Sequence, residues 1–420
     1  GGGGGGGGGG KEFGGPLGAA AMVAGLPAVC VGLYATCSGG ACAALAPPAV
    51  PFALPPAWVS LAGAGVWLSW LLAVLGLHLG LPGRNVRGVR LAGGGQLQYK
   101  MNALAVYGVA LGSLFVLSFG LGALDIGWAA DHFFELQTAS IAFSLLLSLG
   151  LYLKSHAPGA VLAEHGNTGN ALEDFFMGRE LNPRIGRLDL KEFCELYPGL
   201  IGWAGLNLAM AYRQYTQLGR VTNSMVLVNV FQALYVADAL WYEPAILSTM
   251  DITTDGFGFM LAFGDLTWVP ITYTLQARYL VDHPQDLSPG YLAFVVALKV
   301  LGYAIFRGAN GDKDKFRREP DHPRARRLKY MNTERGTKLI ISGWWGLARH
   351  INYTGDWLMG LAWCLPCGIT HVVPYFYAIY FACLLIHRDM RDNAACRLKY
   401  GRDWDKYCAH VPYRLVPYVY

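Results

Sequence analysis

The stretch Ser342-Gly-Trp-Trp-Gly-Leu-Ala-Arg-His-Ile-Asn-Tyr-Thr-Gly-Asp356 lies between two apolar regions and concentrates hydrogen-bonding side chains. These side chains belong to Arg349, His350, Asn352, Tyr353 and Asp356. Polar groups near membrane depth are costly and usually mark a site, and glycine lets a ligand approach the backbone closely. We therefore interpret this stretch as the wall of a ligand pocket at a membrane face.

The composition is typical of a polytopic membrane protein. Of the 420 residues, 54% are hydrophobic and only 15% are charged, outside the range of ordinary soluble domains. Gly1–Gly10 matches G-x-G-x-x-G, but no strand precedes it and no apolar helix begins on it, so we interpret it as a tag or linker. The nine cysteines are scattered, and Cys364 and Cys367 form a lone C-x-x-C pair. We expect neither a metal site nor a disulfide framework.

Apolar runs of membrane-spanning length predict an all-α protein with about ten transmembrane helices. The runs cover Gly18–Cys37, Ala57–Leu81, Met101–Gly122, Phe133–Leu153, Gly199–Tyr212, Ser224–Trp241, Gly256–Val281, Gly290–Phe306 and the longer block Trp357–Ile386. Pro366, Gly368 and Pro374 break the last block, which we interpret as a tight pair of helices. Pro270 predicts a kink in the run that contains it.

Charge in the connections predicts the orientation of the chain. The connection Arg307–Arg349 holds twelve Lys and Arg against five Asp and Glu, and the second connection holds Arg84, Arg87, Arg90 and Lys100 without acids. Connections on the other side hold acids instead, namely Asp125, Asp131, Asp282 and Asp286. Basic connections face the cytosol, so both chain ends are predicted to be cytosolic. Of the two long connections, we expect Lys154–Pro198 to be ordered and Glu319–Lys338 to be mobile.

Two groups of side chains predict an anionic cofactor. Arg388, Asp392, Cys396 and Tyr400 follow one another at i+4 and share one face of a helix. Lys313 and Arg317, also at i+4, suit phosphates, because Arg offers a planar fork and Lys a point charge. The alternatives are a solvated tail and a loop beside anionic lipid. Together with the Trp-rich stretch Ser342–Asp356, both groups favour a nicotinamide dinucleotide phosphate as the cofactor. Because no Rossmann fingerprint is present, we expect helix ends to form its pocket.

Polar residues inside the apolar runs predict a polar path in a greasy cavity. They are Tyr235, Asp238, Asp265, Thr267, Tyr273 and Gln276, and Glu243 follows the run that contains the first two. Each alone is also compatible with a hydrogen-bonded packing group between helices. Together they favour an apolar substrate with one or two polar handles.

The chain resembles the sterol reductase family, in the branch that contains delta-14-sterol reductases and the membrane domain of the lamin B receptor. The residues that carry the resemblance lie in Gly169–Gly186, Phe193–Trp203, Thr249–Asp265, Phe306–Asn310, Ser342–Asp356, His387–Gly401 and Val411–Arg414. The resemblance covers about Gly166 to Tyr420. It divides the chain into residues 1–17, the amino-terminal helices in 18–165 and a catalytic region in 166–420, with a cytosol-facing cofactor pocket in the carboxyl-terminal half.

The resemblance implies NADPH-dependent reduction of the delta-14 double bond of a sterol, in the endoplasmic reticulum or inner nuclear membrane. It implies proton delivery by Tyr235 and Asp392, with Tyr407 nearby. The cofactor contacts that it implies are Lys313, Arg317, Ile340, Trp345, Asn352, Tyr353, Arg388, Asp392, Cys396, Arg397, Leu398, Lys399, Tyr400 and Tyr407. The sterol and the lipid bilayer are the expected partners, and no nucleic acid is expected. Ile351, where the family has Pro, and Tyr242-Glu243-Pro244, where it has His-Glu-Glu, depart from the pattern.

Three alternatives remain open. Within the family they are delta-7 reduction and a scaffold like the lamin B receptor, although only about seventeen residues precede the first apolar run. Isoprenylcysteine methyltransferases resemble the carboxyl-terminal part, but their S-adenosylmethionine lacks the phosphates that Lys313 and Arg317 suit. A transporter is disfavoured because the sequence shows no internal repeat.

Overall fold

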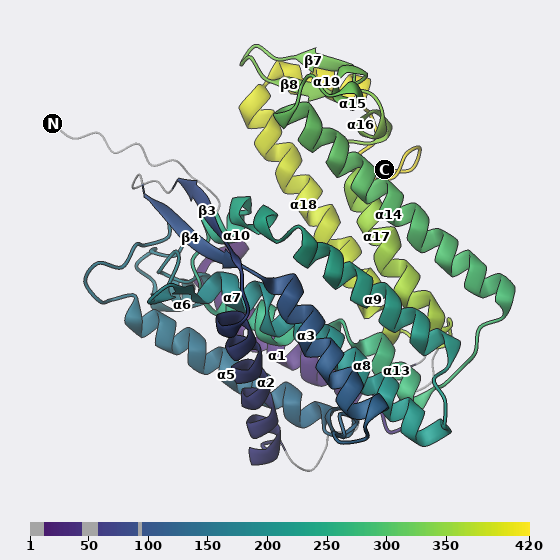
Figure 1. Cartoon of the computed structure of the whole chain (residues 1–420). Coiled ribbons are helices and arrows are strands. Elements are labelled where there is room, and N and C mark those ends of the chain that lie inside the picture. Colours follow the sequence, from purple (N-terminus) through teal and green to yellow (C-terminus); the bar gives the residue numbers. More distant parts are fainter. Residues whose placement is uncertain (1–11, 44–57, 91–94) are drawn as a thin grey trace. The chain divides into compact units, whose positions relative to one another are not determined.

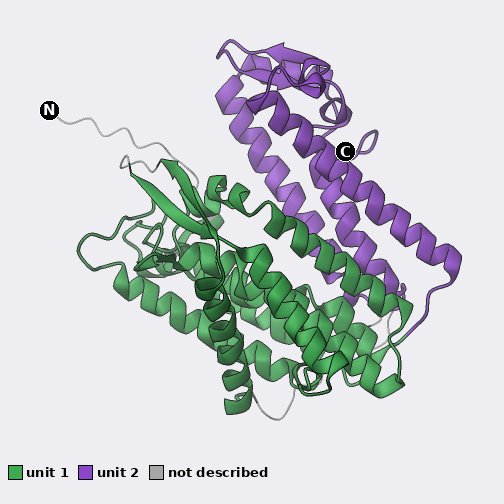
Figure 2. Cartoon of the chain, viewed as in Figure 1, with its two compact units in different colours: residues 1–284 green, residues 285–420 purple. Residues whose placement is uncertain are grey.

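The structure is a computed structural model and describes residues 12–43, 58–90 and 95–420 (Figure 1). These residues are mostly helical, with four short two-stranded antiparallel sheets. The chain forms two compact units, Gly1–Pro284 and Gln285–Tyr420 (Figure 2). This boundary separates regions that pack internally, so the division expected at residue 166 stays a prediction. Gly1–Gly10 lies outside the described residues.

The first unit is built on long helices joined by short ones and by hairpins. The long helices are α1 (Gly15–Ala35), α2 (Leu61–Gly80), α3 (Ala103–Phe115, continued by the π-helical turn η2, Val116–Gly120), α5 (Phe133–Lys154), α8 (Pro198–Leu218) and α9 (Asn223–Trp241). Shorter elements are η1 (Glu12–Gly14), α4 (Trp128–Asp131), α6 (Ala171–Met177), α7 (Leu190–Leu196), η3 (Glu243–Ser248) and α10 (Met250–Thr253). The hairpins pair β1 (Cys37–Ser38) with β2 (Ala41–Cys42), β3 (Arg84–Arg90) with β4 (Gln96–Met101), and β5 (Arg184–Ile185) with β6 (Leu188–Asp189).

Six helical segments in the described part of the chain are long and apolar enough to cross a membrane. They are Gly15–Ala35, Leu61–Gly80, Ala103–Gly120, Phe133–Lys154, Asn223–Trp241 and Pro289–Arg318. Each matches an expected span, so the polytopic membrane class is supported. The other expected spans fall on helices that are shorter or more polar, such as α8, and the count of ten stays a prediction.

Helix α8 is too polar to be recognised as a span because it carries buried amides. Asn207 and Gln214 are 1% and 0% exposed. Asn207 donates to the side-chain oxygen of Gln232 in α9, and Gln214 donates to the main-chain oxygen of Leu280 at 2.8 Å. Neighbouring helices thus accept hydrogen bonds from both amide nitrogens, as is common between membrane helices, while the Oδ1 atom of Asn207 is buried without a partner among the described residues.

The run expected as one kinked helix after Gly256 is broken into segments. These are α11 (Phe259–Phe263), the π-helical turn η4 (Gly264–Trp268), α12 (Val269–Thr272) and α13 (Leu275–Asp282). Pro270 stands in the first turn of α12, where its missing N–H costs little. The hydroxyls of Thr272 and Thr274 donate to the main-chain oxygens of Trp268 and Pro270, each at 2.7 Å. The position expected for a kink therefore coincides with the change from π-helical to α-helical turns, one residue before Pro270.

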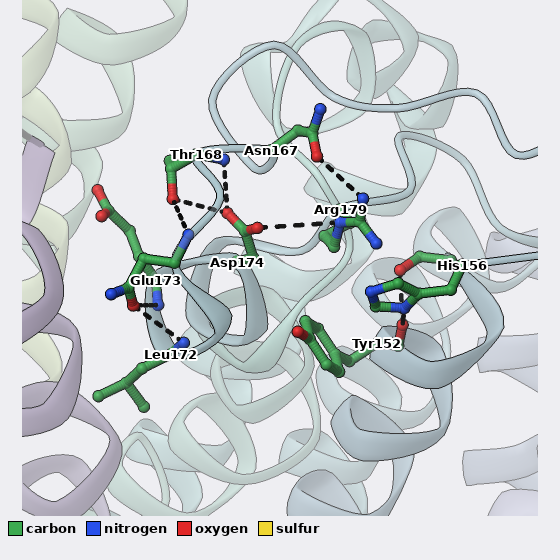
Figure 3. A network of polar contacts seen from close by, with 10 residues as sticks. Tyr152, His156, Asn167, Thr168, Leu172, Glu173, Asp174 and Arg179 are labelled. Atoms are coloured by element: carbon green, nitrogen blue, oxygen red, sulfur yellow. Dashed lines mark hydrogen bonds and ion pairs between the residues drawn. The ribbon is translucent and has the colours of Figure 1, made fainter.

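The connection after α5 is ordered, as expected, around Asp174 (Figure 3). The Asp174 carboxylate is 4% exposed and accepts from the amide and hydroxyl of Thr168, at 2.7 and 2.8 Å. Arg179 donates to Asn167 at 3.0 Å, and Asn170 caps the first turn of α6. Main chains also meet here: a Cβ on Gly178 would lie 2.2 Å from the amide nitrogen of Gly258. Two of the stretches that carry the family resemblance therefore contact each other through glycine.

A disulfide joins Cys37 to Cys42 across the β1–β2 hairpin, where the sequence had given no expectation of a disulfide framework. Arg278 of α13 donates to the main-chain oxygen of Cys37, and its guanidinium lies 4.4 Å from the centre of the Tyr34 ring. Disulfides persist in oxidising compartments. The bond therefore fits the expected position of this hairpin outside the cytosol.

The second unit consists of three long helices with a small layer of short elements at one end (Figure 1). The helices are α14 (Pro289–Arg318), α17 (Ile351–Cys364) and α18 (Phe376–Tyr400). The short elements are α15 (Pro323–Arg326), β7 (Tyr330–Asn332), β8 (Lys338–Ile340), α16 (Trp344–Leu347) and α19 (Arg402–His410), and the turns η5 (Leu365–Cys367) and η6 (Val373–Tyr375) join α17 to α18. The expected tight pair is confirmed.

The basic connection differs from its prediction in two ways. Helix α14 extends to Arg318, so Lys313 and Arg317 lie on a helix rather than in a loop. The stretch Glu319–Lys338, expected to be mobile, instead contains α15 and a hairpin in which Tyr330 pairs with Ile340. The charge pattern indicated the side of the membrane but carried no information on local structure.

Helices α14 and α17 pack with their backbones in contact. A Cβ on Gly302 would lie 2.7 Å from the oxygen of Gly355, and one on Gly355 would lie 2.7 Å from the amide nitrogen of Phe306. Small residues at a crossing allow this close approach between membrane helices. The contact fixes the position of the end of α14 relative to the start of α17, where the expected cofactor residues lie.

Candidate cofactor site

The stretch Gly308-Ala-Asn310 on α14 receives three side chains from Trp344 to Asn352. A Cβ on Gly308 would lie 2.4 Å from Nε1 of Trp344, so only glycine leaves room for that indole. The Trp345 indole donates to the oxygen of Ala309 at 2.8 Å, and the Asn352 amide donates to Oδ1 of Asn310 at 3.3 Å. Each residue of this short motif thus has a structural partner in the Trp-rich stretch.

Lys313 lies one turn further along α14, with its ammonium 4.6 Å from the centre of the Trp345 ring. Trp345 is 6% exposed and packs in a cluster with Ile340. A cation above an indole face is stabilised by the ring quadrupole. Arg317 follows at i+4 and is exposed. The expected group Lys313, Ile340 and Trp345 is therefore brought together, with Arg317 toward solvent.

Asn352 has an unused acceptor. Its Oδ1 is buried and has no hydrogen-bond partner among the described residues. Leaving a buried acceptor unpaired costs about 1–3 kcal/mol. The residue therefore favours a ligand that brings an N–H or O–H donor to this position.

Tyr353 and Asp392 form the hydrogen bond at the centre of the site. The Tyr353 hydroxyl donates to Oδ2 of Asp392 at 3.1 Å, and the Arg388 guanidinium lies 5.7 Å from the centre of the Tyr353 ring. Within the described part of the chain no ion pair joins Asp392 to Arg388, and Asp392 does not contact Tyr400. The helix face shared by Arg388 and Asp392 is confirmed, but the partner of Asp392 is Tyr353, from another helix.

Tyr407 lies in a neighbouring aromatic cluster. It is buried with Trp404 and Val411, and Cys396 and Tyr400 pack against this group. Burial raises the pKa of Tyr407 to about 12, and the Arg349 charge opposes the shift. The phenol is therefore protonated at neutral pH, as an ordinary tyrosine is, and burial makes it a weaker acid.

The remaining expected site residues have other surroundings. Arg397 and Leu398 are exposed, and Arg397 pairs with Asp405 at 3.2 Å. The Lys399 ammonium lies 5.1 Å from the centre of the Tyr400 ring. Tyr235 belongs to the first unit, where its ring lies 6.1 Å from that of Trp203.

Several polar residues of the first unit have structural partners there. Glu243 accepts from the amides of Asn102 and Ala103 and from the Tyr197 hydroxyl, so it caps the start of α3. Thr267 bonds to Ser144 at 3.0 Å and Gln276 accepts from Gln232 at 3.1 Å. For Thr267 and Gln276 the packing alternative is the better one.

The first unit also holds an apolar cavity of about 430 Å³ between α2, α3, α5 and α8. Trp67, Trp70, Gly202 and Leu206 are among its lining residues, and none of the expected site residues is. The first unit therefore contains an apolar cavity of the kind expected, but the residues of the expected polar path do not line it.

Sequence reasoning missed a buried network beside the cofactor residues. Asp389, 1% exposed, contacts His350, Arg414 and Tyr420. Only His350 had been singled out, because Asp389 sits one residue from Arg388 and lies outside the i+4 series. No pattern on α18 marked Asp389 as buried, because its apolar neighbours Ile386 and Met390 are exposed.

Comparison with known proteins decides the family. The model of the ergosterol biosynthesis ERG4/ERG24 family matches residues 10–420. The chain belongs to that family. It is 48% identical to the Delta(14)-sterol reductase TM7SF2 of Mus musculus over 421 residues, which cover 97% of each chain. It is 52% identical to the Delta(14)-sterol reductase erg24 of Schizosaccharomyces pombe over 332 residues, 78% of this chain and 77% of that one.

A third relative is longer than this chain. The chain is 47% identical to the Delta(14)-sterol reductase LBR of Gallus gallus over 408 residues, 96% of this chain and 63% of that protein. These relatives are reductases that act on a sterol, so the resemblance seen in the sequence motifs is confirmed. The match extends over the amino-terminal helices as well, where the motifs had shown little.

Proposed function

We propose that the protein reduces the delta-14 double bond of a sterol with NADPH. The similarity to Delta(14)-sterol reductases over nearly the whole chain carries this proposal. It favours delta-14 over delta-7 reduction, and it favours reduction over methyl transfer. The proposed setting is the endoplasmic reticulum membrane, with the inner nuclear membrane as the alternative.

The residues of the second unit fit NADPH. Lys313 and Arg317 offer two cations on one face of α14, which suits the phosphates that distinguish this cofactor. Trp345 offers a flat surface, and Oδ1 of Asn352 offers an acceptor for an amide or a ribose hydroxyl. When bound, the cofactor supplies the hydride.

The chemistry also requires an acid. An isolated alkene accepts hydride only after protonation toward a carbocation, so a proton must be held beside the substrate. Tyr407 remains protonated at neutral pH, and Asp392 holds the Tyr353 hydroxyl. We assign proton delivery to Tyr235 and Asp392 with Tyr407 nearby; Tyr235 enters through the family resemblance.

The test is an incubation of purified protein with NADPH and a delta-14 sterol, followed by mass analysis of the product. We expect a product with two more hydrogen atoms and a saturated C14 position. Reduction of a delta-7 sterol in preference would move the assignment to the sibling reaction. Tight binding of S-adenosylmethionine without NADPH binding would favour the methyltransferase alternative.

A further inference from the structure

The last ten residues of the chain fold back onto the start of α17. The amides of Arg349 and His350 donate to the oxygens of Tyr413 and Arg414, at 3.0 and 2.8 Å. The Thr354 hydroxyl donates to the oxygen of Leu415 at 2.6 Å. The segment then closes on itself, because the Arg414 amide donates to the oxygen of Tyr420 at 2.8 Å. The chain terminus is thus fastened to the stretch that carries Asn352 and Tyr353.

Asp389 of α18 is the charged anchor of this arrangement. Its carboxylate is 1% exposed. One oxygen lies 2.6 Å from Nη2 of Arg414 and 3.5 Å from the Tyr420 hydroxyl, and the other lies 3.5 Å from Nε2 of His350. A carboxylate this deeply buried is stable only when its lone pairs are used. Here two partners come from the chain terminus and one from the polar stretch.

His350 connects Asp389 to the cofactor residues. Its ring stacks on that of Tyr353, with centroids 4.8 Å apart and planes 14° from parallel. The Tyr353 hydroxyl in turn donates to Asp392, one turn along α18 from Asp389. The two carboxylates therefore hold the two ends of one stacked pair, with Asp389 on the imidazole and Asp392 on the phenol.

We propose that Asp389 is a positioning residue that couples the carboxyl-terminal segment, through Arg414 and His350, to the orientation of Tyr353 and the strength of cofactor binding. The proposal rests on the proposed function, since it takes the site around Tyr353 to hold NADPH. It assigns a role in cofactor binding to the chain terminus, which contributes none of the expected cofactor contacts.

The charges around His350 give a readout that a merely structural anchor would not move. Burial lowers the pKa of His350, and the negative charges of Asp389 and Asp392 oppose this. The titratable and charged groups that face His350 are Asp389 and Asp392 on α18, Lys313 on α14, and the adjacent Arg349. Removing the Asp389 charge should lower the His350 pKa further, and removing the Arg414 charge beside Asp389 should raise it.

The experiment measures NADPH binding to the purified full-length chain by quenching of tryptophan fluorescence, from about pH 5 to about pH 8. The variants are Asp389→Asn, Arg414→Gln and Tyr420→Phe. The control is Asp321→Asn, which breaks an exposed ion pair to Arg326 at 3.1 Å and alters none of the expected cofactor contacts. Thermal unfolding of each variant shows which of them fold.

We expect Asp389→Asn and Arg414→Gln to weaken NADPH binding by about tenfold or more, since the first leaves the partly buried Arg414 and the second the buried Asp389 without its charged partner. The pH midpoint of the change in affinity should move down in Asp389→Asn and up in Arg414→Gln. Tyr420→Phe should weaken binding by about threefold, and Asp321→Asn should match the parent.

Folded Asp389→Asn and Arg414→Gln proteins with parental affinity and unchanged midpoints would overturn the inference. If those two variants do not fold, Tyr420→Phe tests the coupling instead, because it keeps the ion pair between Asp389 and Arg414 and removes only the weak contact of the Tyr420 hydroxyl with Asp389. Parental binding in Tyr420→Phe would then reject the coupling. A parent chain that binds no NADPH at any pH would instead reject the proposed cofactor, so the two failures are distinguishable.

Discussion

Replacing Asp392 with Asn tests the hydrogen bond at the centre of the site. The change keeps the size of the side chain and removes the charge that accepts from Tyr353 at 3.1 Å. A hydrogen bond to a charged group contributes about 1.5–3 kcal/mol. At about 1.4 kcal/mol for each factor of ten, turnover should fall by about tenfold to about 150-fold. A pair with Arg388 would have predicted about 3–5 kcal/mol, so the structure lowers the expected effect.

The assay is sterol reduction at saturating NADPH and equal amounts of inserted protein, for Asp392→Asn, Tyr353→Phe and the double variant. Since the two side chains share one bond, the double variant should be little worse than either single one, with a coupling of at least about 1 kcal/mol. Asp314→Asn is the control, because its ion pair with Arg318 is exposed and should contribute less than about 1 kcal/mol. Single-variant effects that add to within about 0.5 kcal/mol would refute this reasoning.

Three further predictions concern the cofactor, the orientation and the fold. If Lys313 and Arg317 bind the cofactor phosphate, NADPH should bind more tightly than NADH, and Arg317→Ala should narrow the difference by about 1.5–3 kcal/mol in a direct binding assay; equal affinities in the parent would exclude this role. An epitope near Arg326 should be accessible from the cytosolic side of intact vesicles and one near Asp286 should not; a protected Arg326 epitope would contradict the ten-helix topology. Gly178→Ala should destabilise the protein by more than about 3 kcal/mol, because its Cβ would collide with the main chain of Gly258. Gly159→Ala is the control, since Gly159 also has a positive φ but no atom near the position of a Cβ, and it should cost about 1–2 kcal/mol. Thermal unfolding of both variants measures these losses of stability, and equal losses would show that the collision is relieved.

The sequence predicted the fold class and the long apolar helices because these follow from composition and run length. The irregularity near Pro270 was predictable for a different reason, because the missing N–H of proline affects the helix locally. The end of α14 was not predictable in this way, because most of its last nine residues, Asn310–Arg318, are polar and the helix there has contacts such as that of Trp344 with Gly308. The Cys37–Cys42 disulfide depends on a tight hairpin that two scattered cysteines do not reveal.

The sequence predicted which residues form the candidate site better than it predicted which of them contact each other. Lys313, Trp345, Asn352 and Tyr353 come together as the motifs indicated. The i+4 rule placed Arg388 and Asp392 on one face of α18, but it says nothing of a third helix that offers a better donor, which is why Tyr353 was missed as the partner. Asp389 could be found only from burial, a property that depends on the folded chain terminus.

The cofactor residues on α14 lie far along the helix from the glycine crossing with α17, so a small change of angle at the crossing moves them by a larger distance. Lys313 lies eleven residues beyond Gly302, or about 16 Å along the helix axis at 1.5 Å per residue. A tilt of about 10° at this crossing would move Lys313 sideways by about 3 Å, which is more than the range of donor–acceptor distances that a hydrogen bond tolerates. A larger side chain at Gly302 or Gly355 would therefore act at a distance. Its first effect would be weaker cofactor binding, although neither glycine is among the expected cofactor contacts.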